Sequence, residues 1–135
     1  MNKITVIGSM SIDLVVSASK RPGKGETILG DDFFTTPGGK GANQAVAAAR
    51  LGDNVHMIGR IGDDDFGKEI YENLQNNHVI VDGVEPVTQM PSGTAHITLS
   101  EQDNSIIVVP STNNEVTPDY VKKHLEALSE GDIVL

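Results

Sequence analysis

The chain has 135 residues, a formal net charge of −9 and no cysteine. The length suffices for one domain with a buried core, and no apolar run is long enough to cross a membrane. The acidic balance argues against nucleic acid and anionic membranes as partners, because both require a basic face. The lack of cysteine excludes disulfides and thiolate chemistry, and it favours a cytoplasmic setting.

The first elements predict an α/β fold. Residues 4–8 are apolar and β-branched and end in glycine, which is typical of a short buried strand. Residues 9–13 would follow at its carboxyl end, the edge at which open α/β sheets bind ligands. Asp13 can accept hydrogen bonds from two neighbouring hydroxyls of a diol, or it can be a turn carboxylate bonded to local backbone. Residues 14–17 and 27–36 predict further extended segments.

A glycine-rich stretch, Gly38-Gly39-Lys40-Gly41-Ala42-Asn43, joins a loop to a helix. Its glycines permit unusual backbone angles, and the alanine-rich residues 42–51 predict a helix. Unpaired N–H groups at a helix start, together with the side chains of Lys40 and Asn43, can bind a small polar ligand. The alternative is a tight turn that binds nothing.

Two familiar glycine-rich motifs do not fit this chain. A phosphate-binding loop requires Ser or Thr after its lysine, whereas Gly41 follows Lys40. The dinucleotide fingerprint requires G-x-G-x-x-G directly after the first strand, and residues 8–13 do not supply it.

The rest of the chain continues the alternation of strands and helices. The triplet Asp63-Asp64-Asp65 favours helix capping over a metal site, because adjacent carboxylates splay apart and no histidine accompanies them. The four histidines are scattered, as is typical of structural or exposed positions rather than metal ligands. The sequence predicts strands at 55–59 and 79–81, a helix at about 63–77 and a hairpin at 94–109. It then predicts a helix from Thr117 to about Gly131, with Val121, Leu125 and Leu128 as its apolar stripe. A buried strand is predicted from Ile133.

Several of these motifs agree, in the same order, with one known family. The stretch Gly38-Gly39-Lys40-Gly41-Ala42-Asn43-Gln44-Ala45, followed by Gly52 and Gly62, resembles the N-terminal signature of the ribokinase-like (PfkB) sugar kinases. Gly8-Ser9-Met10-Ser11-Ile12-Asp13, Pro22-Gly23-Lys24-Gly25-Glu26-Thr27 and Gly62-Asp63-Asp64-Asp65-Phe66-Gly67 are also similar to that family. The resemblance implies a doubly wound α/β sheet with helices on both faces, and a small β-sheet lid from segments near 14–17, 27–36 and 94–109.

The resemblance also implies an activity. Family members of this kind transfer a phosphoryl group from MgATP to the primary hydroxyl of a pentose, giving ribose 5-phosphate if the sugar is ribose, and a monovalent cation such as K⁺ can assist. The positions that match the family's sugar contacts are Ser11, Asp13, Gly39, Lys40 and Asn43. Ser11 stands where ribokinases often have asparagine, which weakens the assignment of ribose against other sugars. The lid implies a homodimer that pairs through it.

In the family, a second half of similar length carries the ATP site, a glycine-rich anion hole and the catalytic aspartate. No Gly-Ala-Gly-Asp-like segment occurs here. We therefore expect residues 1–135 to be the sugar-binding half and lid of a truncated chain, with no catalytic residue of its own and inactive alone. The alternatives are a kinase of the same family for another sugar or a nucleoside, and a non-catalytic sugar-binding or dimerisation module.

Overall fold

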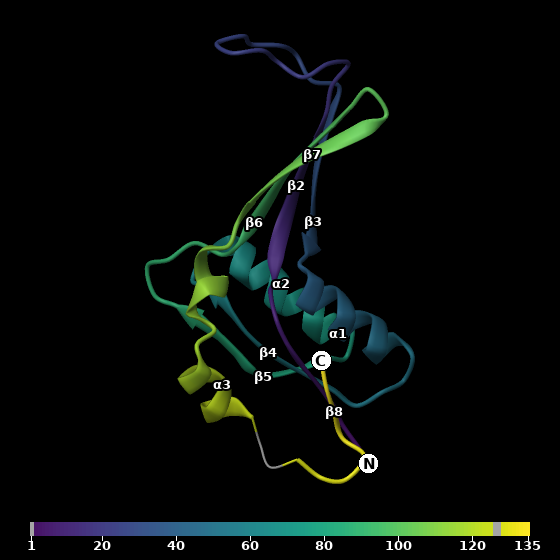
Figure 1. Cartoon of the computed structure of the whole chain (residues 1–135), viewed down its shortest axis with the longest axis vertical. Helices are drawn as coiled ribbons and strands as arrows, with labels where there is room; N and C mark the ends of the chain where they lie inside the picture. The colour runs from purple at the N-terminus through teal and green to yellow at the C-terminus, as the bar shows by residue number, and fades with distance from the viewer. Residues whose placement is uncertain (1, 126–127) are drawn as a thin grey trace.

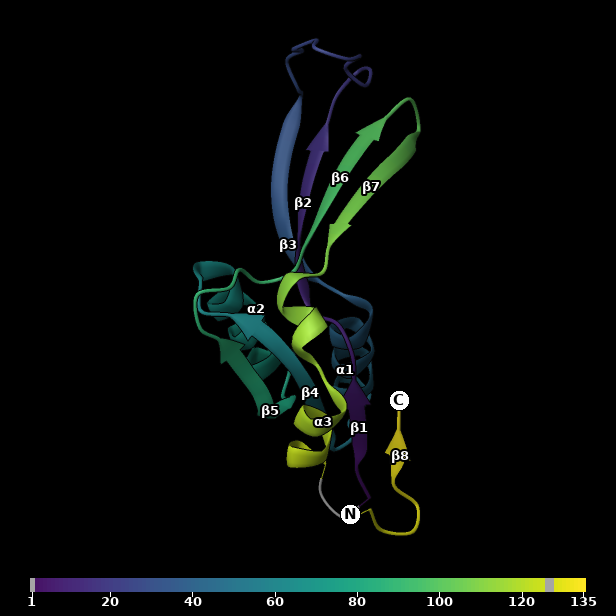
Figure 2. The ribbon, with the colours of Figure 1, turned by 60° about the vertical axis from the view of Figure 1, so that its left-hand side comes forward.

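The computed structural model describes residues 2–125 and 128–135. A parallel sheet with flanking helices forms the lower part of the molecule in Figure 1, and a second sheet projects away from it. The two sheets meet at a narrow junction, where the strands of the projecting sheet converge (Figure 2).

The parallel sheet has the strand order β5-β4-β1-β8. Its members are β1 (Ile4–Ile7), β4 (Val55–Gly62), β5 (Ile80–Val87) and β8 (Ile133–Val134). The predicted strands are all present, and β4 and β5 run further than expected. The prediction that the strand from Ile133 is buried is wrong for the described structure, because β8 lies at the sheet edge and Ile133 is 50% exposed.

Helices cover both faces of this sheet, as predicted. Helices α1 (Lys40–Arg50) and α2 (Asp65–Asn76) pack on one face, where Ala45 and Leu74 are fully buried. Helix α3 (Pro118–His124) lies on the other face (Figure 2). It is held there by the hydroxyl of Tyr120, which is within hydrogen-bond distance of the Gly59 and Gly83 carbonyls in β4 and β5.

Helix α3 begins as the sequence predicts and is shorter. The Thr117 side chain accepts a hydrogen bond from the Tyr120 amide, and Pro118 occupies the first turn. The helix ends at His124, and Leu128, expected on its apolar stripe, is 51% exposed. The predicted continuation at residues 126 and 127 lies outside the described residues.

The projecting sheet has the order β3-β2-β6-β7. Strand β2 (Ser11–Ser17) pairs antiparallel with β3 (Asp32–Gly38) and parallel with β6 (Thr94–Ser100). The predicted hairpin is β6 with β7 (Asp103–Val109), and a short 3-10 helix, η1 (Ser111–Glu115), follows it. Strand β2 starts three residues earlier than expected, and β3 lies later than the expected extended segment 27–36.

Candidate functional site

A cavity of about 360 Å³ lies where the projecting sheet meets the start of α1. All five residues that the sequence singles out line it, from two elements that are distant in the chain. The lining comprises Ser11, Asp13, Gly39, Lys40 and Asn43, together with Ser9, Ala95, Val108, Val109 and Asn113.

Strand β2 supplies Ser11 and Asp13. The sequence predicts these residues in the segment after the first strand and before the extended residues 14–17. They instead belong to the projecting sheet, where Ser11 pairs with Gly38 and Asp13 with Thr36. Residues two apart in a strand share a face, and the Ser11 hydroxyl lies 3.5 Å from Oδ1 of Asp13. Burial raises the pKa of Asp13, and the contact with Ser11 offsets part of that rise.

Gly38 makes room for the Asp13 carboxylate. A Cβ atom at position 38 would lie 2.6 Å from both carboxylate oxygens, closer than a real Cβ comes to any neighbour. The carboxylate is therefore packed against bare backbone on one side. Its other side lines the cavity, and the packing against Gly38 contributes to the burial that raises its pKa.

Helix α1 supplies Lys40 and Asn43 from its first turn. Gly39 precedes the helix with a φ of 96°, which favours glycine, and no side chain caps the helix start. The Ala42 amide donates to the Ser9 carbonyl at 3.0 Å, which anchors this start to the segment between β1 and β2. The helix predicted over residues 42–51 begins two residues earlier, at Lys40.

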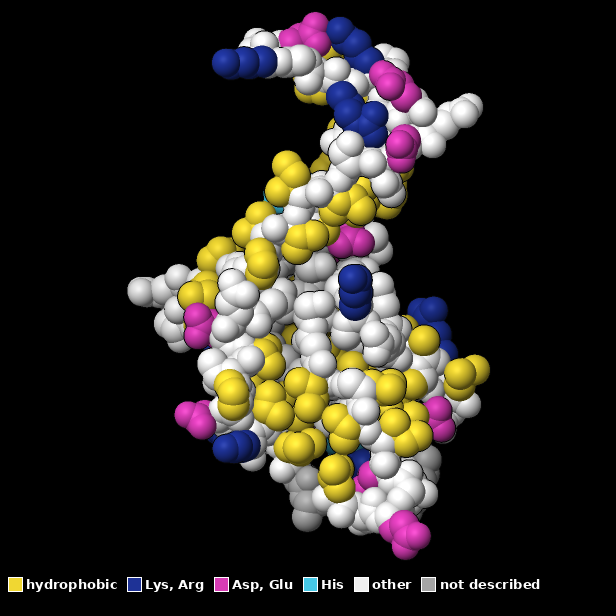
Figure 3. All heavy atoms as spheres, in the orientation of Figure 1, with side chains coloured by type: hydrophobic (Ala, Val, Ile, Leu, Met, Phe, Trp, Pro, Cys, Tyr) yellow, Lys and Arg dark blue, Asp and Glu magenta, His cyan; other side chains and the backbone are white. Residues whose placement is uncertain are grey.

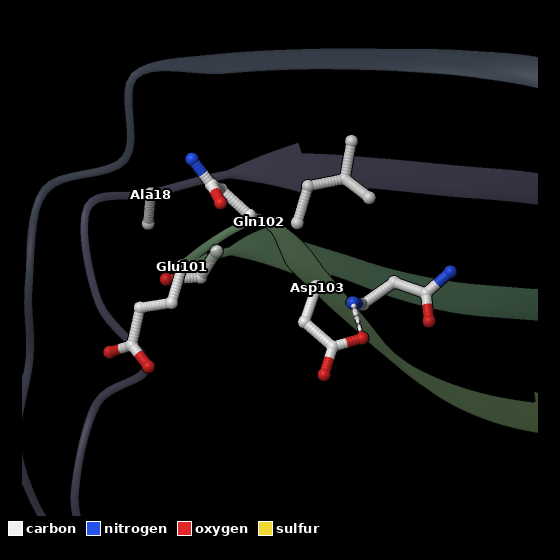
Figure 4. Close-up of a pocket in the computed structure, with 7 residues that line it drawn as sticks. Ala18, Glu101, Gln102 and Asp103 are labelled. Atoms are coloured by element: carbon white, nitrogen blue, oxygen red, sulfur yellow. Dashed lines mark hydrogen bonds between the residues drawn. The ribbon is translucent and has the colours of Figure 1, made fainter.

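A larger hollow, about 580 Å³, lies at the far end of the projecting sheet (Figure 4). It is bounded by Ala18 and the β6–β7 turn at residues 99–104. The side chains of Glu101, Gln102 and Asp103 point in different directions rather than toward one point. This hollow therefore lacks the convergent polar groups that characterise a ligand site.

One carboxylate of the triplet, Asp64, caps the start of α2, as predicted for this stretch. Asp64 accepts hydrogen bonds from the Gly67 amide at 2.9 Å, the Ser92 amide at 2.9 Å and the Ser92 hydroxyl at 2.6 Å. Partial burial raises the pKa of Asp64, but these hydrogen bonds outweigh it and hold the pKa below its usual value. Asp63 accepts from the Gln89 amide, so both carboxylates fix the loop that leads into β6.

Among residues 2–125 and 128–135, no group of three or more His, Cys, Asp or Glu side chains is placed to hold a metal ion. No helix in the same residues is both long and apolar enough to cross a membrane.

Comparison with known proteins identifies the family. The model of the pfkB family carbohydrate kinases matches residues 1–135. The chain belongs to this family. Ribokinase from Bacillus subtilis is 57% identical over the whole chain, and ribokinase from Lactococcus lactis is 48% identical. The chain covers 46% and 45% of these two proteins, so it spans about half the length of the curated relatives it matches.

Solved structures agree with this family assignment. The structure of Arabidopsis thaliana ribokinase complexed with ribose and ATP superimposes with a TM-score of 0.78 at 38% identity. The match covers 84% of this chain and 38% of that one. The pfkB fold is therefore present in this half-length chain.

Sequence reasoning missed five residues of the cavity. Ser9 lies inside the motif of residues 8–13, so its neighbours in the chain point to it. Ala95, Val108 and Val109 lie in the predicted hairpin without any local mark of a site. Asn113 follows the hairpin, and its partner Met10 is 103 positions away, so no local pattern reveals it.

Proposed function

We propose that this chain provides the sugar-binding half and lid of a ribokinase, which phosphorylates D-ribose to D-ribose 5-phosphate with ATP in the full-length protein. The observation that carries the proposal is the convergence of Ser11, Asp13, Lys40 and Asn43 on one cavity between two sheets. The 57% identity to a ribokinase supports ribose as the sugar.

The cavity has the chemistry that a sugar requires. Its volume lies within the range of small-molecule sites, about 300–1,000 Å³. Asp13 accepts hydrogen bonds from two adjacent hydroxyls, Asn43 offers both a donor and an acceptor, and Lys40 donates. Ala95, Val108 and Val109 provide an apolar wall for the C–H groups of the ring. Gly39 brings backbone close to the ligand.

The projecting sheet acts as the lid in this proposal. It supplies Asp13 from β2 and the apolar wall from β6 and β7, so sugar binding and closure involve the same strands. Closure would exclude water, which competes with the sugar as phosphoryl acceptor. The residues of this chain thus bind and orient the hydroxyl that accepts the phosphoryl group.

The remaining parts of the reaction are assigned to the rest of the full-length protein. The general base is proposed to be an aspartate there, which removes the proton from the sugar hydroxyl. The described residues do not fit a divalent ion, because no set of three ligating side chains converges. The proposal therefore places ATP, Mg²⁺ and any K⁺ outside this chain and assigns no step here to the ions.

We further propose a homodimer through the lid. Phe34, Val15, Ile97 and Ile106 are directly paired across the four strands, and they lie on the same face as Asp13, because residues two apart share a face. We call these four residues the apolar row. Phe34 is 50% exposed and Ile106 is 52% exposed. Hydrophobic side chains gather along the middle of the projecting sheet, below its charged tip (Figure 3). A second copy of the lid would cover this surface.

Other members of the family phosphorylate other substrates, and Ser11 is the residue that favours this alternative. A hydroxyl is shorter than an amide and lacks its two donors, so the cavity around Ser11 can accept a different sugar or a nucleoside. The second alternative is a non-catalytic sugar-binding or dimerisation module. The cytoplasmic location expected from the sequence remains a prediction that cell fractionation can check.

A substrate panel on the full-length protein tests the proposal. Sugar-dependent formation of ADP is measured with D-ribose, 2-deoxyribose, fructose and a nucleoside, and we expect the highest kcat/KM with D-ribose. A higher kcat/KM for another substrate would establish the first alternative. Sugar binding in calorimetry without any ADP formation would establish the module.

A further inference from the structure

Met10 lies at the junction between the two sheets. The chain leaves one sheet for the other four times, at residues 8–10, at residue 39, at residues 88–93 and from residue 110 onward. The side chain of Met10 is fully buried in the core of the parallel sheet, whereas β2 of the lid begins one residue later. Met10 therefore belongs to the core through its side chain and to the lid through its backbone.

The other three crossings all approach the Met10 backbone. A Cβ atom on Gly39 would lie 2.8 Å from the Cα of Met10, and a Cβ atom on Gly93 would lie 3.0 Å from its carbonyl oxygen. The fourth crossing, after β7, contributes the Asn113 side chain. All four crossings between the sheets therefore lie against the backbone of Met10.

The Asn113 carboxamide binds both polar groups of that backbone. Its Oδ1 accepts from the Met10 amide at 2.9 Å, and its Nδ2 donates to the Met10 carbonyl at 2.8 Å and to the Pro110 carbonyl at 3.0 Å. The orientation of the carboxamide is fixed, because a backbone N–H only donates and a carbonyl only accepts. Both N–H hydrogens of Asn113 are thereby occupied, although the residue lines the sugar cavity.

We propose that Asn113 is a positioning residue for the sugar site. Its carboxamide fixes the position of the Met10 peptide. The fixed peptide in turn holds three cavity residues in place: Ser9 and Ser11, which flank Met10, and Asp13, which lies further along β2. Because Asn113 follows β7, the same contact ties the far strand of the lid to the start of β2. The inference rests on the proposed sugar kinase function and adds the residue that fixes the start of β2 at the sugar site.

Two variants of the full-length protein test this role. Asn113→Asp keeps the shape of the side chain but replaces the donor to the Met10 and Pro110 carbonyls with an acceptor. Asn113→Ala removes all three hydrogen bonds. Asn114→Ala is the control, since Asn114 is the exposed neighbour in the same 3-10 helix. We expect both Asn113 variants to raise the KM for the sugar about tenfold while their KM for ATP stays within about twofold of wild type. In the Asn114→Ala control, both KM values should stay within about twofold of wild type.

A second readout does not depend on activity. Hydrogen–deuterium exchange of a peptide that spans residues 8–14 should be faster in both Asn113 variants than in wild type and in Asn114→Ala. If the wild-type protein phosphorylates no sugar, the proposed function fails, and the exchange experiment alone decides the role of Asn113.

Three results would overturn the positioning role. The first is an unchanged sugar KM in both Asn113 variants of an active enzyme, even if their melting temperatures fall. The second is unchanged exchange of the peptide at residues 8–14. The third is an Asn113→Asp protein that does not fold, because Asn113 would then serve the fold rather than the position of the site.

Discussion

Gly8 and Gly41 lie in direct backbone contact. A Cβ atom on Gly8 would lie 3.0 Å from the Cα of Gly41, and a Cβ atom on Gly41 would lie 2.7 Å from the carbonyl carbon of Gly8. This contact lets α1 approach the end of β1 more closely than any side chain would allow. It therefore places Lys40 and Asn43, on either side of Gly41, next to the segment that leads into β2.

Gly41→Ala should disturb both stability and sugar binding. The added methyl group meets backbone rather than a flexible side chain, and overpacking of this kind costs about 1–3 kcal/mol. We expect a lower melting temperature and weaker sugar binding, because the helix start moves away from Ser9. Gly23→Ala is the control, since a Cβ atom there meets nothing within 4 Å. Equal melting temperatures for the two variants would contradict the prediction.

Truncation of either polar side chain of the cavity should weaken sugar binding. Asp13→Ala and Asn43→Ala each leave sugar hydroxyls without a partner, which costs roughly 1–3 kcal/mol of binding free energy. Titration calorimetry with the full-length protein measures the loss. Arg50→Ala, at the far end of α1, serves as the control. Unchanged affinity in both cavity variants would show that the sugar binds elsewhere.

Asp13→Asn should stabilise the sugar-free protein at neutral pH while it weakens sugar binding. Burial raises the pKa of Asp13, so the folded protein holds the proton more tightly than the unfolded chain does. The neutral carboxyl group therefore stabilises the folded protein at pH values below the pKa of Asp13 in the unfolded chain. This stabilisation is lost as the pH rises through the pKa of Asp13 in the folded protein. Replacing the charge with an amide should recover that stability.

The pH dependence of melting provides the test for Asp13→Asn. The gain in melting temperature should be present at neutral pH and vanish below about pH 4, the usual pKa of aspartate. Asp53→Asn changes an exposed aspartate and controls for net charge. A variant that melts below wild type at neutral pH would be inconsistent with a carboxylate destabilised by burial.

Asp64→Ala should destabilise the protein by about 1–3 kcal/mol, because the Ser92 hydroxyl, the Ser92 amide and the Gly67 amide lose their acceptor. The pKa of Asp64 is lowered, so its contribution is present above the ordinary aspartate pKa and is lost as the pH falls through the folded pKa. Urea unfolding at several pH values measures this, with the exposed Asp65→Ala as the control. A difference that persists in strong acid would argue for a packing effect instead.

The apolar row predicts a face-specific effect on assembly. Ile106→Glu places a charge in the row, whereas Ile107→Glu places it on the opposite face of the same strand. We expect the first variant to convert the proposed dimer of the full-length protein to a monomer and the second to leave it intact. Analytical ultracentrifugation distinguishes these outcomes. Dissociation by Ile107→Glu alone would assign the interface to the other face.

Local pattern was sufficient for much of the fold and for part of the site. The glycine-rich stretch before Asn43 predicts a ligand-facing helix start, and the structure places that start at the cavity. The aspartates before Phe66 predict a capped helix, and Asp64 caps it. These features depend on contacts within a few residues, so the sequence displays them directly.

Long-range pairing explains what the sequence did not reveal. Ser11 and Asp13 belong to a strand because Gly38 and Ala95 pair with that segment, and a run that begins with a serine gives little local indication of a strand. The exposure of Ile133 likewise depends on its position at the edge of the sheet, although an apolar strand is usually buried. The role of Asn113 depends on a partner near the other end of the chain.

The parallel pairing of β2 with β6 has a consequence for how the protein folds. All of α1, β4, α2 and β5 lies between these two central strands of the lid, so no local turn can bring them together. Pairing of distant segments is slow, because the chain loses entropy before the contacts form. We therefore expect β1, β4 and β5, which pair over shorter separations, to assemble before β2 pairs with β6, so that newly made protein acquires this part of its core before it can hold a ligand.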